Sequence, residues 1–333
     1  MLPSVMKLTD NVENVICSEE TLKRHPELHH YTNEAGFEGI VSSQTLWCSH
    51  YRGLVDQDEV RLLRKLLPSA VAPQMDAIVA TLDRKKRRLW KKAGGGETTA
   101  RDLVDSLYGA TFDGRGKYSE IEAFVLSLST HSQDTDFDRK HGIRSQWEEY
   151  AGLEGYCIVF DTLTLAEQLR REGAAKYWAW LMLDPVRYAD QPINELFPEL
   201  ILKSADTLRQ FIGGTRYPEM AIPEFLAGAT LLKGVKYKSE RELRIVAIPG
   251  TATLAKHAAR DYPSEFDAKM PLPVVRERTA DGKTKQFVAL FEAMNLRLPI
   301  QRVIVGPGPR QEGRVSKARS WLGDIPIALS RCE

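Results

Sequence analysis

The sequence predicts an α+β fold that carries a helical insertion, and three observations support this. Residues 28–32 and 124–129 are predicted to form two short strands, and in the second strand hydroxyl residues stand at alternate positions among apolar ones. A continuous apolar run at 156–160 predicts a strand buried on both faces at the centre of a sheet. Residues 53–112 instead carry apolar side chains at helical spacing, so we expect amphipathic helices there.

Composition excludes several classes of protein. The chain has 333 residues, of which 43% are hydrophobic and 27% charged, with a net charge of +1, so no global field favours nucleic acid or membranes. It has no apolar run of about 18 residues, the length that spans a bilayer. Cys17, Cys48, Cys157 and Cys332 are far apart, which argues against a zinc ribbon or a disulfide framework. We therefore expect a cytoplasmic protein with no metal site and no membrane partner.

The order of elements suggests one main domain. We expect a loosely structured lead-in over 1–27 and a single catalytic-type α+β domain over 28–333, with the helical insertion at 53–112. Inside the insertion, Pro68 and Pro73 predict a break between two helices. The part of the chain after residue 250 is less regular. The stretch 251–283 is polar and rich in proline, so we expect it to be mostly loop.

A basic cluster ends the second helix of the insertion. Most such clusters are solvated helix ends, where cations interact favourably with the helix dipole. Contact with nucleic acid is the sharper alternative, because phosphate binding depends on clustered lysine and arginine. The candidate residues are Arg84, Lys85, Lys86, Arg87, Arg88, Lys91 and Lys92.

The stretch 236–248, KYKSERELRIVAI, contains the candidate catalytic residues. In a strand that begins near Arg241, alternation places Glu240, Glu242 and Arg244 on one face and apolar residues on the other. Such a strand can form the floor of a cleft. The alternative is a solvated sheet edge whose charges only maintain solubility.

Polar and aromatic side chains mark two further segments. Ser127 and Ser129 alternate with apolar residues in one predicted strand, which indicates a polar pocket face or one wet side of an outer strand. Trp147 and Tyr150 are three residues apart on a predicted helix. They form either part of the core or a flat surface for a planar ring.

Several separated motifs together resemble the bacterial family catalogued as domain of unknown function 2971. They are LHHYT followed by TLW, FVLSLST, WEEYA, GYCIVFD, VRYAD, SERELRIV and VIVGPGP, in this order. The resemblance covers roughly residues 28–330 apart from the helical insertion, and the joint order of the motifs is more specific than any one of them.

A more distant resemblance, to the ADP-ribosyltransferase superfamily, implies a fold and an activity. A first strand with His before a hydroxyl residue, a serine-bearing middle strand and a late Glu-x-Glu strand are similar to that superfamily. The resemblance implies a split mixed or antiparallel β core that uses NAD as its substrate. It implies that Glu242 is catalytic and Glu240 assists. The NAD-contacting residues would be His30, Tyr31, Thr32, Ser127, Ser129, Trp147, Tyr150 and Arg244.

These residue types suit the chemistry. Cleaving the N-glycosidic bond of NAD builds positive charge on the ribose, which a fixed carboxylate stabilises. A neutral imidazole can donate a hydrogen bond to a sugar hydroxyl and hold its orientation. The resemblance therefore suggests an NAD-dependent mono-ADP-ribosyltransferase, a bacterial toxin or antiphage effector that modifies a nucleic acid or protein and has an antitoxin or other defence partner. This hypothesis requires His30 and Glu242 to share one face of the sheet.

Two other hypotheses remain open. The chain is alternatively a non-enzymatic module of a bacterial defence system that binds nucleic acid or protein through the basic cluster. In that case Glu240, Glu242 and Arg244 form only a structural charge network. A metal-dependent nuclease is the weaker third hypothesis, since only Asp161 with Glu242 suggests a ligand pair.

Overall fold

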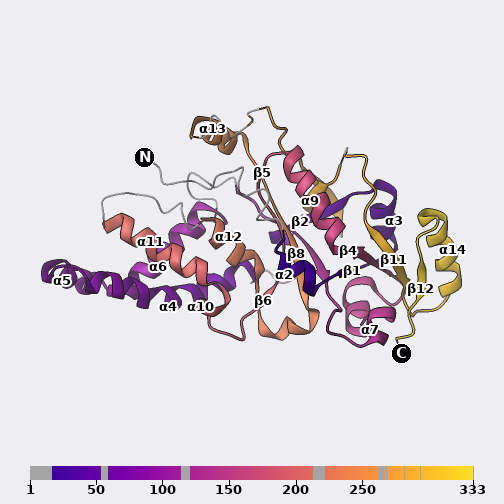
Figure 1. The fold of residues 1–333 in the computed structure, drawn as a ribbon, viewed down its shortest axis with the longest axis horizontal. Coiled ribbons are helices and arrows are strands. Elements are labelled where there is room, and N and C mark those ends of the chain that lie inside the picture. The colour runs from indigo at the N-terminus through magenta and orange to yellow at the C-terminus, as the bar shows by residue number, and fades with distance from the viewer. Residues whose placement is uncertain are drawn as a thin grey trace. The chain divides into compact units, whose positions relative to one another are not determined.

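The computed structural model describes residues 17–53, 59–113, 121–212, 222–261, 267, 269–280, 282–292 and 294–332. The chain divides into two compact units (Figure 1). The helical unit contains Tyr51–Ala123 and Val186–Lys238, and the sheet unit contains Thr9–His50, Phe124–Pro185 and Ser239–Glu333. The predicted insertion thus lies wholly in the helical unit, together with a second stretch from the middle of the chain.

A large sheet, mostly antiparallel, forms the centre of the sheet unit. Its strands pair in the order β12-β11-β4-β1-β3-β2-β10-β9, and β8 pairs with both β3 and β5. Only β11 and β12 run parallel among the pairs described in this sheet. The predicted α+β class with a mostly antiparallel sheet is confirmed. The strands are β1 (Glu27–Thr32), β2 (Leu46–His50), β3 (Phe124–Ser129), β4 (Tyr156–Asp161), β5 (Trp178–Pro185), β8 (Glu242–Pro249), β9 (Val275–Ala280), β10 (Lys283–Leu290), β11 (Ile300–Val305) and β12 (Ile327–Leu329).

The sheet forks at β3. Strand β8 pairs with β3 along its whole length, from Phe124 to Ser129. On the other edge of β3, β1 pairs at the Ser129 end and β2 pairs at the Phe124 end. The sheet therefore continues as two branches, β1-β4-β11-β12 and β2-β10-β9, which separate beside β3.

One face of this sheet is covered by three helices, α3 (Glu34–Ser43), α9 (Thr162–Ala175) and α14 (Gln311–Leu322) (Figure 1). Their apolar side chains, such as Phe37 and Leu165, join strand residues in the main core. Local capping explains where the first two helices begin, because Asn33 and Asp161 accept hydrogen bonds from the first turns of α3 and α9.

The opposite face carries a smaller core near β1 and β4. It is covered by the helical segment η2 (Trp147–Ala151), whose Trp147 packs with Tyr31, Cys157 and Val159. The other helices of the sheet unit are α2 (Glu19–Arg24), α7 (Asp136–His141), α8 (Arg144–Gln146) and α13 (Ala252–Asp261). Helix α2 and its Ser18 cap lie in the predicted lead-in, whose residues 1–16 are outside the described part of the chain.

The helical unit packs its helices around α4 (Glu59–Ala80), which corrects one prediction. Pro68 and Pro73 lie inside α4 and do not break it. Leu63, Leu67 and Val71 follow at four-residue spacing and are fully buried. Burying one continuous apolar stripe outweighs the backbone hydrogen bonds that the prolines remove. Its other elements are η1 (Tyr51–Gly53), α5 (Arg84–Lys92), α6 (Gly95–Ala110), α10 (Ile193–Leu196), α11 (Pro198–Ile212), α12 (Ile222–Leu231), β6 (Arg187–Tyr188) and β7 (Leu232–Lys233), and η4 (Val235–Glu240) leads into β8.

One further sequence prediction needs revision, and one strand was not predicted. The stretch 251–283, expected to be mostly loop, contains α13 and β9. The aromatic segment before Asp184 forms β5, a strand paired with β8, although its sequence shows no clean alternation. No helix in the described ranges combines the length and apolarity needed to cross a bilayer.

Candidate functional site

Three strands that carry the sequence motifs lie side by side, in the order β1-β3-β8. The register aligns one residue from each strand in a single row. His29 lies opposite Ser129, and Ser129 lies opposite Glu242. Directly opposed residues share a face and have Cβ atoms about 4.5–5.5 Å apart. The fold therefore assembles a histidine, a serine and a glutamate on one face of the sheet; we call these three residues the polar row.

The expectation that His30 and Glu242 share a face is wrong. His30 lies opposite Ile158, a residue of the main core, so its side chain belongs to the opposite face from Glu242. Its Nδ1 lies 3.2 Å from the carbonyl oxygen of Ser127, where β1 separates from β3. Because side chains alternate along a strand, an assignment shifted by one residue changes the face.

Arg244 and Glu242 form a buried ion pair on the same face as the polar row. The Arg244 guanidinium donates to both Glu242 carboxylate oxygens, at 2.7 and 3.1 Å. Both side chains are almost completely buried, 3% exposed for Glu242 and 1% for Arg244. Ser127 lies opposite Arg244 and so belongs to this face as well. Such bidentate pairs fix both groups in position and favour the ionised carboxylate.

The residue between the two glutamates has an unusual backbone. Arg241 has φ of +47°, in the left-handed region that bulky residues seldom adopt. Its carbonyl accepts a hydrogen bond of 3.0 Å from the Thr130 amide, and its guanidinium pairs with Asp134. Two anchors thus hold a strained turn directly before Glu242. Strain maintained in this way is a feature that often accompanies functional sites.

Tyr150 hydrogen-bonds Glu240, which is 9% exposed. Burial and then the charge of Glu240 raise the pKa of the Tyr150 hydroxyl, so it stays protonated and donates to the carboxylate. The Tyr150 side chain is 40% exposed and so remains accessible, whereas Trp147 is fully buried and forms part of the core. Of the two predicted aromatic platforms, only Tyr150 has an exposed surface.

His29 of the polar row stacks on His131. Their ring centroids are 3.8 Å apart with an interplanar angle of 10°. Tyr31 shares this face, and its hydroxyl lies 3.2 Å from His131 Nε2 and accepts a hydrogen bond from the Ile143 amide. Burial, and then repulsion from His131, hold the pKa of His29 well below its usual value. Both imidazoles are therefore neutral near pH 7.

This stack predicts a pH-dependent stability. Burial lowers the pKa of His131 from 6.5 to about 4. Since the unfolded chain binds a proton more readily, stability is fully present above pH 6.5 and is lost as the pH falls toward 4. We expect His131→Phe, which keeps an aromatic ring, to reduce the stability loss between pH 7 and pH 5 by about 2 kcal/mol. Urea denaturation at both pH values measures this, and equal losses in the two proteins would contradict it.

Sequence reasoning missed three members of this arrangement: His29, His131 and Gln146. Gln146 accepts a 3.0 Å hydrogen bond from the Ser129 hydroxyl. The adjacent pair His29-His30 was visible in LHHYT, but only the strand register distinguishes their faces. Thr32 lies on the face of His30, opposite Tyr156 at the end of β1, and so does not join the polar row.

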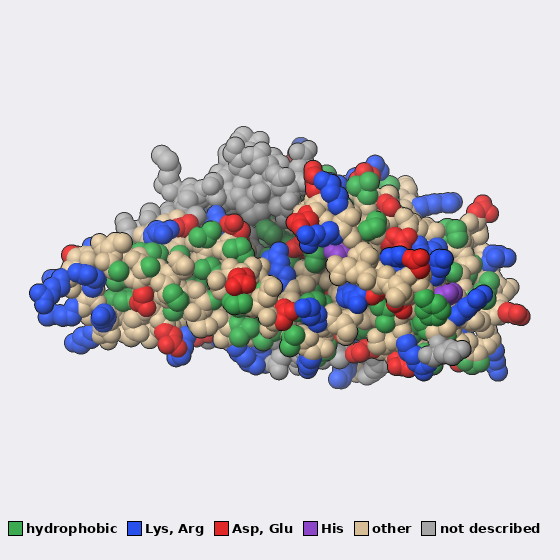
Figure 2. All heavy atoms as spheres, turned by 60° about the horizontal axis from the view of Figure 1, so that its bottom comes forward, with side chains coloured by type: hydrophobic (Ala, Val, Ile, Leu, Met, Phe, Trp, Pro, Cys, Tyr) green, Lys and Arg blue, Asp and Glu red, His purple; other side chains and the backbone are tan. Residues whose placement is uncertain are grey.

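The basic cluster forms α5 in the helical unit. Asp83 caps this helix by accepting a hydrogen bond from the Lys86 amide, and none of its residues is buried. Its cations form no ion pair with any acidic residue of the described ranges. Figure 2 shows these lysine and arginine side chains gathered at one end of the unit. Helix α5 therefore presents a positively charged surface to solvent.

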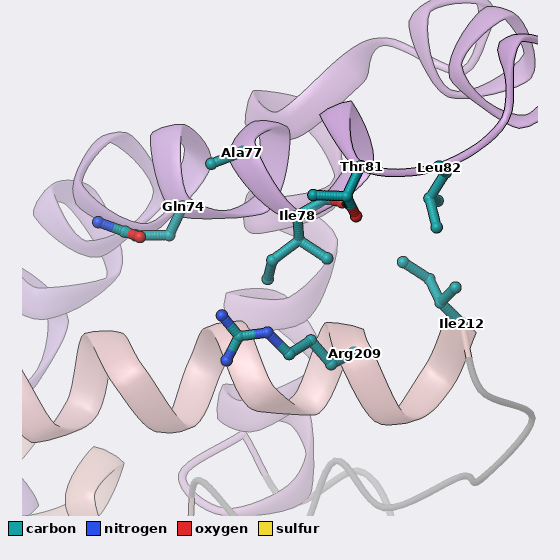
Figure 3. Close-up of a pocket in the computed structure, with 7 residues that line it drawn as sticks. All are labelled: Gln74, Ala77, Ile78, Thr81, Leu82, Arg209 and Ile212. Atoms are coloured by element: carbon teal, nitrogen blue, oxygen red, sulfur yellow. Dashed lines mark hydrogen bonds between the residues drawn. The ribbon is translucent and has the colours of Figure 1, made fainter.

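The helical unit also contains a pocket between α4 and α11 (Figure 3). Arg209 reaches from α11 toward Ile78 on α4, and its guanidinium pairs with Asp206 on its own helix. The remaining lining is Gln74, Ala77, Thr81, Leu82 and Ile212. None of the candidate residues from the sequence lines this pocket.

Comparisons with protein-family models, with curated proteins and with solved structures find no match to this chain. The described residues also contain no group of three or more His, Cys, Asp or Glu side chains arranged to hold a metal ion.

Proposed function

We propose that the protein is an NAD-dependent mono-ADP-ribosyltransferase whose site lies at the polar row. The observation that supports this proposal is the direct alignment of His29, Ser129 and Glu242 across three adjacent strands. The histidine strand, the serine strand and the Glu-x-Glu strand are then neighbours, as the superfamily resemblance implies. The transferase hypothesis that the sequence suggested, with His30 in the site, fails because His30 lies on the other face from Glu242. The proposal is a revised one that assigns the histidine role to His29, which shares the face of Glu242.

The reaction needs few groups. The bond between the ribose C1′ and the nicotinamide nitrogen breaks, and nicotinamide leaves with the electron pair. A nucleophile of the acceptor then bonds to C1′ and loses its proton. The Glu242 carboxylate, held in position by Arg244, stabilises the positive charge that develops on the ribose. Glu240, oriented by Tyr150, is the second carboxylate and the candidate base for the acceptor proton.

Labelled NAD tests this proposal. Folded protein incubated with NAD and a bacterial extract is expected to release nicotinamide and to label an acceptor in the extract. A nuclease-treated and a protease-treated extract distinguish a nucleic-acid acceptor from a protein one. Neither release nor labelling, from protein whose cooperative unfolding shows that it is folded, would reject the proposal. A toxin or antiphage effector is the biological setting that the resemblance implies.

A second candidate function is binding of nucleic acid by α5 without chemistry. The exposed cations of α5, which have no acidic partner in the described ranges, favour it. The triple variant Lys85→Ala, Arg87→Ala and Arg88→Ala is expected to weaken binding to duplex DNA. It should also reduce the slope of log affinity against log salt by about 3 units, since each lost phosphate contact removes roughly one. An unchanged slope would exclude α5 as the interface.

A further inference from the structure

A second positively charged surface lies on the branch β2-β10-β9 of the sheet unit. In the hairpin of β9 and β10, Arg276 and Arg278 face the same way as Lys283 and Lys285, because Arg278 lies opposite Lys285. The only acidic residue of these two strands, Glu277, lies opposite Gln286 on the other face. Four cations therefore share one face, although none was singled out in the sequence.

Aromatic side chains lie among these cations. Phe287 lies opposite Ser49 and Ala289 lies opposite Trp47, so both rings are on the basic face. Their centroids are 4.4 Å apart, and the Arg278 guanidinium lies 5.3 Å from the centre of the Trp47 ring. Phe287 is buried, whereas Trp47 is 39% exposed. Phe287 and Arg278 thus both pack on an indole that stays partly exposed to solvent.

Protection of a sheet edge explains only part of this surface. Strand β9 ends the sheet order, and charged side chains on an edge strand discourage pairing with another chain. That role does not require an exposed tryptophan, whose ring costs solubility. It also does not require all four cations to lie on the same face as the aromatic rings. Among the described residues, Glu292 pairs with Arg276 at 2.6 Å and so neutralises part of this face.

We propose that this face binds single-stranded nucleic acid. Proteins that bind single strands combine cations that contact the phosphates with aromatic side chains on which bases stack. Trp47 would stack one base, Arg278 would contact that base or its phosphate, and the lysines of β10 would follow the backbone. Ser49 lies opposite Phe287 on one side and opposite Val125 of β3 on the other. Trp47 and the four cations therefore lie on the same face of the sheet as the polar row.

Fluorescence anisotropy with labelled 12-nucleotide strands tests the proposal, and it needs no NAD. Wild-type protein is expected to bind a single strand more tightly than the matching duplex. Trp47→Ala should weaken single-strand binding about 10-fold or more, and Trp47→Phe should recover most of it, because stacking on one base has this magnitude. Comparing RNA with DNA of one sequence distinguishes the two sources of the strand.

Two comparisons make the result decisive. The triple α5 variant is expected to retain the effect of Trp47→Ala on single strands, since the two surfaces act independently. Trp47 is partly exposed, so its replacement should leave the unfolding midpoint close to that of wild type. Wild-type affinity for single strands in folded Trp47→Ala would overturn the proposal. Equal affinity of the wild-type protein for single strand and duplex would overturn it as well. Because binding is measured without catalysis, its failure is distinct from failure of the transferase proposal.

Discussion

Glu242→Gln is expected to reduce nicotinamide release about 10²–10³-fold, the usual effect of removing one group that stabilises transition-state charge. Glutamine keeps the shape of the side chain but not the charge that would face the ribose. The variant also leaves the Arg244 guanidinium without its carboxylate partner, so we expect some loss of stability as well. The rate should therefore be measured well below the unfolding midpoint of each protein.

A matched control separates the charge effect from general damage. Glu277→Gln changes an exposed carboxylate of the same sheet, on the opposite face, and is expected to keep wild-type activity. Wild-type activity in folded Glu242→Gln would remove Glu242 from the site, whatever its effect on stability.

Arg244→Met is expected to give the largest loss of stability. Breaking a buried ion pair from one side typically costs about 3–5 kcal/mol, because the remaining charge stays buried without its partner. Denaturation in urea should show this as a lower midpoint with a similar slope. The exposed pair of Arg276 and Glu292 provides the comparison, and Arg276→Met should cost less than about 1 kcal/mol.

The double variant Glu242→Leu with Arg244→Met tells which role this pair has. Removing both charges together is often neutral or stabilising, so we expect the double variant to be more stable than Arg244→Met alone. It should nevertheless lack activity. If the pair serves structure alone, the double variant keeps the wild-type rate, and that result would remove Glu242 and Arg244 from the catalytic site.

Much of this fold could be predicted from local patterns. Strands β1 and β3 were predicted as short strands, and the continuous apolar run predicted β4 as a central strand, because burial of both faces leaves a signal in the local sequence. The helix break at Pro68 and Pro73 was wrongly predicted, since local backbone preference was overcome by packing of the α4 stripe. Strand β5 was not predicted, because its partner strand β8 lies far away in the sequence.

The candidate site was predictable only in part. Ser129, Glu240, Glu242 and Arg244 were candidates from the sequence, and the strands that carry the histidine, serine and Glu-x-Glu motifs, β1, β3 and β8, are adjacent. It could not distinguish His29 from His30, because a pair of adjacent histidines presents one to each face whatever the register. The His131 stack comes from a polar loop with no periodicity, and nothing in that loop indicated its position.

The most direct test compares nicotinamide release by His29→Gln and His30→Gln under identical conditions. If the polar row is the site, His29→Gln loses at least about 100-fold in rate, as expected for loss of a group that positions the site. His30→Gln then keeps most of the wild-type rate. Full activity in folded His29→Gln together with loss of activity in His30→Gln would contradict the assignment and place the chemistry on the other face of the sheet.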